Sequence, residues 1–181
     1  MALLKAFGNI LTILTTASTI VGAVAIIMMI LHVTIDVMLR NLFLLSVPGT
    51  GGVVANYYMA AASFLPVALA EKLEQHIAVD VLHEKLPSVA KIINLQFVRL
   101  VVAVAAGAAA YGFLLDALQK YQLGSYVLEM NVRIANWPGY FMLPFGFGLW
   151  SLISAHRFLA VLTGSPDLPI SKYIEAKPET E

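Results

Sequence analysis

The 181-residue sequence contains no cysteine and few charged side chains, which excludes several classes of protein. Without cysteine there are no disulfides, no thiolate metal ligands and no cysteine nucleophile. Only 12% of the residues are charged, about half the share in soluble domains, whereas 60% are hydrophobic and the mean hydropathy is +0.83. The formal net charge is zero and no basic block is present, so we expect no nucleic-acid partner. This composition predicts an integral membrane protein.

Four apolar runs approach the ~20 residues that an α-helix needs to cross a bilayer. We expect an all-α membrane domain over residues 1–162, with transmembrane helices at about 6–35, 51–70, 92–115 and 137–157. The first run is longer than the apolar part of a signal peptide, which favours a retained span. The third run reaches spanning length only if Arg99 extends its guanidinium to the headgroups. Continuous apolar runs exclude a β-barrel, whose strands alternate.

The connecting segments differ in character. Residues 72–86 alternate apolar and charged positions at helical spacing, which predicts an amphipathic interfacial helix between the second and third spans. The apolar face of that helix carries Leu73, Ile77 and Val81. In the mixed segment 116–136 we expect short helical extensions. Residues 163–181 contain proline and charge, which predicts a disordered cytoplasmic tail.

Basic residues are divided unevenly between the two sides that four spans define. Eight Lys and Arg residues lie on the side of the termini and the middle connection, and three lie on the other side. The positive-inside rule therefore predicts that both termini are cytoplasmic. The three residues on the opposite side are Arg40, Lys120 and Arg133.

Polar groups near a span are candidates for function because they are expensive in a bilayer. His32, Asp36 and Arg40 recur every fourth residue at the outer end of the first span, and Asp36 and Arg40 are spaced to pair. This stripe is either a contact site for a partner outside the membrane or a self-neutralised helix end. In the second span, Asn56 is expected to bond between helices, and Pro66 to bend its helix.

The third span carries small residues at spacings that let two helices approach closely. We expect it to pack through Ala105, Gly107, Ala109 and Gly112. Aromatic anchors at the membrane interface are expected at Trp137, Tyr140 and Trp150.

The sequence contains no recognisable reaction centre. His32 and His156 lie at opposite ends of their spans, so they cannot hold one haem between them, and no phosphate-binding loop or dinucleotide fingerprint is present. We therefore predict no enzyme activity, no metal site and no cofactor. Two interpretations follow from the residues: an accessory or scaffold subunit, or a free-standing homo-oligomeric channel or transporter.

An ordered set of motifs is more specific. An Asp-x-x-x-Arg-Asn sequence lies at residues 36–41, Pro-Gly-Thr at 48–50, YYMAAASFLPVALA at 57–70 and QHIAVD at 75–80. Trp-Pro-Gly-Tyr and Leu-Pro-Phe-Gly-Phe-Gly-Leu-Trp follow within residues 137–150. Over about residues 5–162, the chain resembles the small membrane subunit (Q, DctQ-like) of tripartite ATP-independent periplasmic (TRAP) transporters.

This resemblance implies a place in a complex of the bacterial inner membrane. A larger M subunit carries the substrate and sodium sites, and a periplasmic P subunit delivers the substrate. The implied role of Q is a static scaffold for sodium-driven uptake of small carboxylates or sulfonates, with M, P and membrane lipids as partners. In this setting, residues 72–86 brace the scaffold in the bilayer, and Asp36 and Arg40 face the docking P subunit.

Two places depart from the family pattern. Gly51 and Gly52 stand where many relatives have an acidic residue after the Pro-Gly-Thr turn. Ala78 stands where many have a basic residue. The resemblance therefore implies no particular contact at these three positions.

Overall fold

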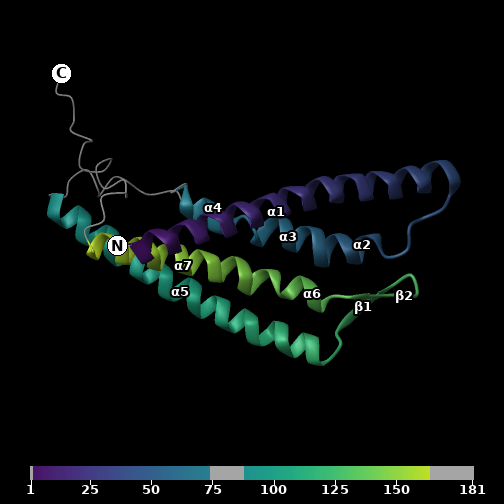
Figure 1. The fold of residues 1–181 in the computed structure, drawn as a ribbon. Coiled ribbons are helices and arrows are strands. Elements are labelled where there is room, and N and C mark those ends of the chain that lie inside the picture. The colour runs from purple at the N-terminus through teal and green to yellow at the C-terminus, as the bar shows by residue number, and fades with distance from the viewer. Residues whose placement is uncertain (1, 74–87, 164–181) are drawn as a thin grey trace, which may run out of the picture.

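A computed structural model of the chain describes residues 2–73 and 88–163. Four helical arms lie side by side, with a small β-hairpin at one end (Figure 1). In chain order the elements are α1 (Ala2–Phe43), α2 (Thr50–Val53), the π-helix η1 (Val54–Tyr58), α3 (Met59–Phe64), α4 (Val67–Lys72), α5 (Ser88–Gln122), β1 (Tyr126–Glu129), β2 (Val132–Ala135), α6 (Trp137–Tyr140) and α7 (Met142–Leu162).

Four stretches of the described chain are long and apolar enough to cross a membrane, which confirms the predicted number of spans. These stretches are Ala6–Phe43, Thr50–Lys72, Ile93–Gln122 and Trp137–Leu162. At the hairpin end, the first and third helices extend beyond the predicted spans by residues 36–43 and 116–122. Polar residues by themselves do not end a helix. Backbone geometry ends α5 instead: Gly124 adopts a φ of 55°, and the N–H groups of Gly124 and Ser125 bond back to the last turn.

The segment 116–136 adds a hairpin that was not predicted to a chain that is otherwise helical over its described residues, as predicted. It first continues α5, as expected, but then forms an antiparallel hairpin in which Tyr126 pairs with Ala135 and Glu129 with Val132. The two turn residues, Met130 and Asn131, have φ values of 48° and 66°, and such positive angles suit a tight two-residue hairpin turn. The strands themselves are rich in the aromatic and β-branched residues that favour pleated structure.

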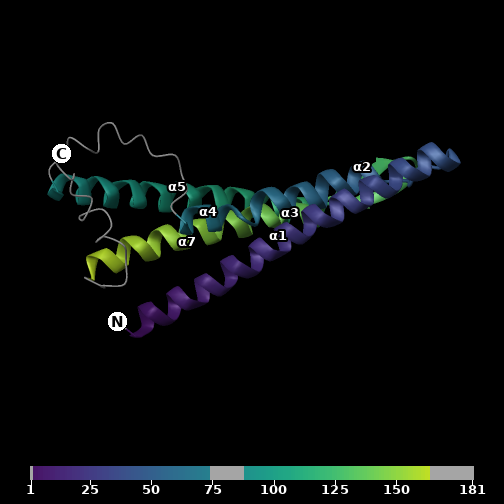
Figure 2. The same cartoon turned by 90° about the horizontal axis from the view of Figure 1, so that it is seen from above.

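The helix α1 packs on the other arms through one narrow stripe. Its residues recur at alternating spacings of three and four, as in a coiled coil, and include Leu11, Thr15, Ser18, Gly22, Ala25, His32 and Asp36. The buried hydroxyl groups of Thr15 and Ser18 donate to backbone carbonyls one turn earlier, so they are satisfied inside the helix. The helix runs obliquely across the bundle (Figure 2), and its remaining faces expose large apolar side chains.

Pro66 interrupts the second arm, as predicted. The helix α3 ends at Phe64 and α4 begins at Val67, because proline supplies no N–H to the helical ladder. Two glycines of the fourth arm let its backbone approach the backbone of the second arm closely. A Cβ atom on Gly139 would lie 1.9 Å from the Asn56 carbonyl oxygen, and one on Gly146 would lie 2.1 Å from the Phe64 carbonyl oxygen.

The third arm, α5, packs mainly against α7. Its buried side chains are Arg99, Ala103, Ala106 and Ala117. The Ser151 hydroxyl on α7 donates to the Ala103 carbonyl at 2.7 Å and lies against Gly107. An apolar cluster of Leu11, Ala68, Leu149 and Ile153 joins α1, α4 and α7.

Candidate functional site at the hairpin end

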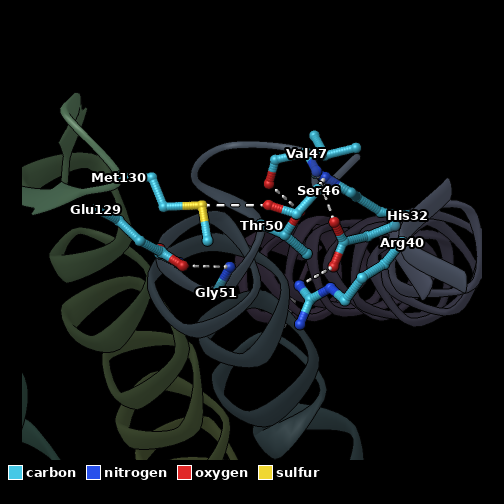
Figure 3. Close-up of polar contacts among 10 residues, drawn as sticks. His32, Arg40, Ser46, Val47, Thr50, Gly51, Glu129 and Met130 are labelled. Carbon is cyan, nitrogen blue, oxygen red and sulfur yellow. Dashed lines mark hydrogen bonds and ion pairs between the residues drawn. The ribbon is translucent and has the colours of Figure 1, made fainter. Parts of the chain in front are cut away.

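Four parts of the chain meet at the hairpin end, and polar side chains join them (Figure 3). They are α1 from His32 to Phe43, the loop 44–49, the helix α2, and the hairpin β1–β2. We call this assembly the hairpin platform.

Asp36 fastens the end of α1 to the loop that follows it. Its side chain is only 6% exposed, and its Oδ2 atom accepts a hydrogen bond of 2.8 Å from Arg40. Its Oδ1 atom accepts the backbone N–H of Val47 at 2.7 Å. The predicted pairing of Asp36 with Arg40 is thus confirmed. The Arg40 side chain is 59% exposed, so it keeps N–H donors for a further contact, whereas the Asp36 carboxylate is buried.

His32 links α1 to the start of the second arm. Its Nε2 atom lies 3.5 Å from Thr50 Oγ1, and its Nδ1 atom lies 3.4 Å from the Tyr58 hydroxyl. Thr50 donates its hydroxyl hydrogen to the Val47 carbonyl at 3.0 Å, so its oxygen accepts from Nε2–H. Tyr58 then donates to Nδ1. Both ring nitrogens are therefore engaged within the fold, which favours a structural role for this histidine.

Glu129 joins the hairpin to the start of α2. Its Oε1 atom accepts the Gly51 N–H at 3.2 Å, and its Oε2 atom accepts the Gly52 N–H. These N–H groups open the second arm, where unpaired donors and the helix dipole favour a carboxylate. A Cβ atom on Gly52 would lie 2.6 Å from Ile134 Cδ1, so the glycine makes room for the hairpin. The carboxylate at the start of α2 therefore comes from the hairpin, a distant part of the chain.

Strand alternation gives the hairpin two faces. Glu129 and Ile134 lie on the face that contacts α2. Tyr126, Leu128 and Arg133 lie on the opposite face, where all three are exposed. The Arg133 guanidinium carbon lies 5.0 Å from the centroid of the Tyr126 ring, a cation–π distance. At the base of this second face, the Ala135 carbonyl accepts the Tyr57 hydroxyl at 2.6 Å, while Tyr126, Leu128 and Arg133 stay exposed.

A second polar cluster lies at the opposite end of the bundle, and sequence reasoning missed it. The Glu71 carboxylate, in a residue only 8% exposed, accepts the Trp150 indole N–H at 2.9 Å and the Ser154 hydroxyl at 2.7 Å. Arg157 donates to the backbone carbonyls of Glu71 and Lys72 at 2.9 and 2.6 Å, which caps the end of α4. The spacing of Trp150, Ser154 and Arg157 on one face of α7 was the available signal.

Two residues carry predicted roles at the membrane interface. Trp150 donates its N–H to Glu71 between the helices, and its role as an interface anchor stays a prediction. Arg99 on α5 is only 6% exposed, and whether its guanidinium extends to the headgroups stays a prediction.

The remaining candidate residues are dispersed. Asn56 donates from its side chain to the Gly52 carbonyl of its own arm at 2.8 Å, and its interhelical contact is made by its backbone. Gly107 faces α7, Ala109 is half-buried, and Ala105 and Gly112 are exposed on α5.

Among the bracing residues, Leu73 is exposed directly after α4. Ile77 and Val81, together with most of the predicted interfacial helix, lie outside the described residues. Within the described ranges, no group of His, Asp and Glu side chains is arranged to hold a metal ion.

A comparison with family models matches residues 29–164 to the DctQ component of tripartite ATP-independent periplasmic transporters. The chain belongs to the DctQ family. No curated protein and no solved structure matches it. The matched range contains the whole hairpin platform and the Glu71 cluster. DctQ proteins are transporter subunits and not an enzyme family, so this chain is the small membrane subunit of a TRAP transporter, whose tripartite organisation implies a large membrane partner and a periplasmic one.

Proposed function

We propose that this DctQ subunit is the static scaffold for the large M subunit in a sodium-coupled transporter of the bacterial inner membrane. The transporter takes up small organic acids, carboxylates or sulfonates, that a periplasmic P subunit delivers. In this proposal, both termini are cytoplasmic and the hairpin platform faces the periplasm.

One observation carries the scaffold role: the second and fourth arms are locked together along their length. The glycine contacts of Gly139 and Gly146 bring backbone against backbone at two levels. Below them, the buried Glu71 and the half-buried Arg157 join the same two arms through charge-assisted hydrogen bonds. Contacts between backbones and buried charges have few alternative arrangements, so these arms are suited to stay fixed while a partner moves.

The groove between these two arms supports the placement of the substrate site in a partner subunit. It has a volume of about 340 Å³ and is open along one side. Its lining residues are Ala55, Asn56, Met59, Ala60, Ser63, Phe64, Gly139, Tyr140 and Leu143, which include no charged side chain. An organic acid that leaves water is best compensated by a cationic side chain, and the lining of this groove includes none.

The length of α1 supports a periplasmic platform. From Gly8, which lies against His156, to His32, which lies beside Tyr58, the helix rises ~36 Å, close to the thickness of a bilayer with part of its interface. From His32 to Phe43 it rises a further ~16 Å. We therefore place Asp36 and Arg40 beyond the hydrocarbon core, on the side that the three basic residues of the outer loops share.

The exposed apolar faces are the surfaces that we assign to the M subunit and to lipid. On α1 they include Ile13 at 67% exposed and Ile20 at 58%. On α5, Ala105 and Gly112 leave room for a partner helix to approach closely. We also retain the proposal that residues 72–86, through Leu73, Ile77 and Val81, brace the scaffold at the cytoplasmic surface.

Purification of the tagged chain from its native membrane tests this function. A stoichiometric membrane partner at least twice its size, together with sodium-dependent uptake by the reconstituted complex, is the expected result. Replacing Gly112 by Leu on the exposed α5 face should lower recovery of that partner, whereas Gly148→Ala, at a position with open space in this chain, should not. Isolation of a pure homo-oligomer that transports by itself would overturn the proposal.

A further inference from the structure

The groove between the second and fourth arms lies along one half of the membrane-spanning part of the chain. Asn56 and Gly139 lie at its hairpin end, and Phe64 and Leu143 lie deeper in the bundle. From Asn56 to Phe64 the second arm rises ~12 Å, most of the ~15 Å that one leaflet contributes to the hydrocarbon core. Lipid chains, and not water, therefore lie beside this groove.

Aromatic side chains mark the membrane interface at the hairpin end of the groove. The centroid of the Tyr121 ring lies 4.9 Å from that of Trp137 and 6.4 Å from that of Phe141. Tyr140 lines the groove itself. Tyrosine and tryptophan gather where the hydrocarbon core meets the headgroups. The mouth of the groove is thus at the level of the headgroups, and its inner end is at the level of the acyl chains.

The groove is narrow and apolar. Ala55, Ala60 and Gly139 add little volume, which leaves the hollow, while Met59 and Leu143 contribute apolar surface. A volume of about 340 Å³ over a length of ~12 Å gives a mean cross-section of ~28 Å². This is roughly a third of the cross-section of an α-helix about 10 Å across. A single hydrocarbon chain is therefore a better occupant than a partner helix.

Polar groups with unused capacity surround the mouth. The Lys120 Nζ atom of α5 lies 5.6 Å from the centroid of the Tyr140 ring, a contact that leaves its N–H donors available. Within the described residues, the Tyr140 hydroxyl forms no hydrogen bond. Asp116, one turn earlier on the same face of α5, is exposed, and as far as the chain is described it forms no ion pair with Lys120.

From this arrangement we propose that the groove binds one phospholipid with a zwitterionic, amine-bearing headgroup. One acyl chain occupies the groove, the phosphate accepts hydrogen bonds from Lys120 and the Tyr140 hydroxyl, and the ammonium group lies toward Asp116. Because the formal charges of Lys120 and Asp116 cancel, the mouth suits a headgroup without net charge better than an anionic one. The inference goes beyond the proposed function and does not depend on which end of the bundle faces the periplasm.

Native mass spectrometry of the full-length chain in detergent tests this site. Phosphatidylethanolamine is added at increasing concentration, and phosphatidylglycerol with the same acyl chains is the anionic comparison. Lys120→Gln removes the cation at the mouth, and Ala60→Phe fills the groove. The matched controls are Arg133→Gln, an exposed cation over a tyrosine ring at the same end, and Ala23→Phe, the same enlargement at an exposed position of α1.

We expect the wild-type chain to retain one phosphatidylethanolamine molecule, and to bind it more tightly than phosphatidylglycerol. Lys120→Gln and Ala60→Phe should each weaken this binding about tenfold, because the first removes a charge-assisted hydrogen bond and the second excludes methylene groups from the groove. The two control variants should change the binding by less than about twofold.

Four results would overturn the inference. Equal weakening by Lys120→Gln and Arg133→Gln would mean that any surface cation attracts the headgroup. Binding unchanged by Ala60→Phe would place the lipid elsewhere on the apolar surface, and tighter binding of phosphatidylglycerol would contradict the headgroup assignment. If the complex with the M subunit lacks the lipid that the chain retains by itself, side chains of that partner occupy the groove. Each of these results leaves the proposed scaffold function standing.

Discussion

Replacing Gly146 by Ala should separate two helices that now touch through their backbones. The new Cβ atom would lie 2.1 Å from the Phe64 carbonyl oxygen, whereas ordinary contacts of this kind begin at 3.4 Å. The fourth arm must therefore move away from α3 by about 1.3 Å, or the helix must distort. Overpacking of this kind costs about 1–3 kcal/mol, and a backbone atom cannot relax by rotation as a side chain can.

Gly148→Ala is the matched control, because it makes the same chemical change in the same helix at a position with nothing within 4 Å. The difference between the two variants cancels the helix propensity of alanine and isolates the clash. Since 1 kcal/mol shifts the Tm of a chain of this size by about 2–4 °C, a cost near 2 kcal/mol predicts that Gly146→Ala melts about 4–8 °C below Gly148→Ala. Thermal melting of the purified chain, followed by tryptophan fluorescence, measures this. Equal melting temperatures would refute the close backbone contact.

Two further predictions concern the end of the bundle opposite the hairpin. Glu71→Ala leaves the Trp150 N–H and the Ser154 hydroxyl without this acceptor and should lower stability by about 1–3 kcal/mol, whereas Glu71→Gln should retain part of it; equal melting of the two variants with the wild type would contradict the cluster. Changing Leu73 and Ile77 together to Asp should lower assembly or uptake if the segment 72–86 braces the scaffold, and unchanged uptake at equal expression would reject that role.

Much of the fold followed from local sequence. Apolar runs placed the four arms, because a bilayer demands about 20 apolar residues for each span. Pro66 broke the second arm where the missing N–H requires it, and the spacing of Asp36 and Arg40 gave their ion pair. The hairpin escaped prediction because it interrupts a mixed segment with only two four-residue strands, whose pairing depends on a turn with two non-glycine residues at positive φ.

The sites were less predictable than the spans, for a physical reason. The Glu71 cluster joins α4 to α7 across 79 and 83 residues of sequence, and Glu129 reaches the start of α2 across 78. No periodicity within one segment reports such partners. The small residues of the third span show the same limit, since spacing alone did not reveal that Gly107 faces α7 while Ala105 and Gly112 face outward.

By itself, the sequence determined a chain with four membrane spans, an uneven distribution of basic residues and the ordered motifs of a TRAP small subunit. These properties depend on local sequence, so they can be predicted without knowledge of tertiary contacts. Only the tertiary structure decided which charges face outward. The platform holds two carboxylates and two guanidiniums, and its net charge says nothing about its surface. Asp36 and Glu129 accept backbone N–H groups of the loop and of α2, because buried donors need acceptors. Arg40, which is paired with Asp36, and Arg133 stay exposed to solvent.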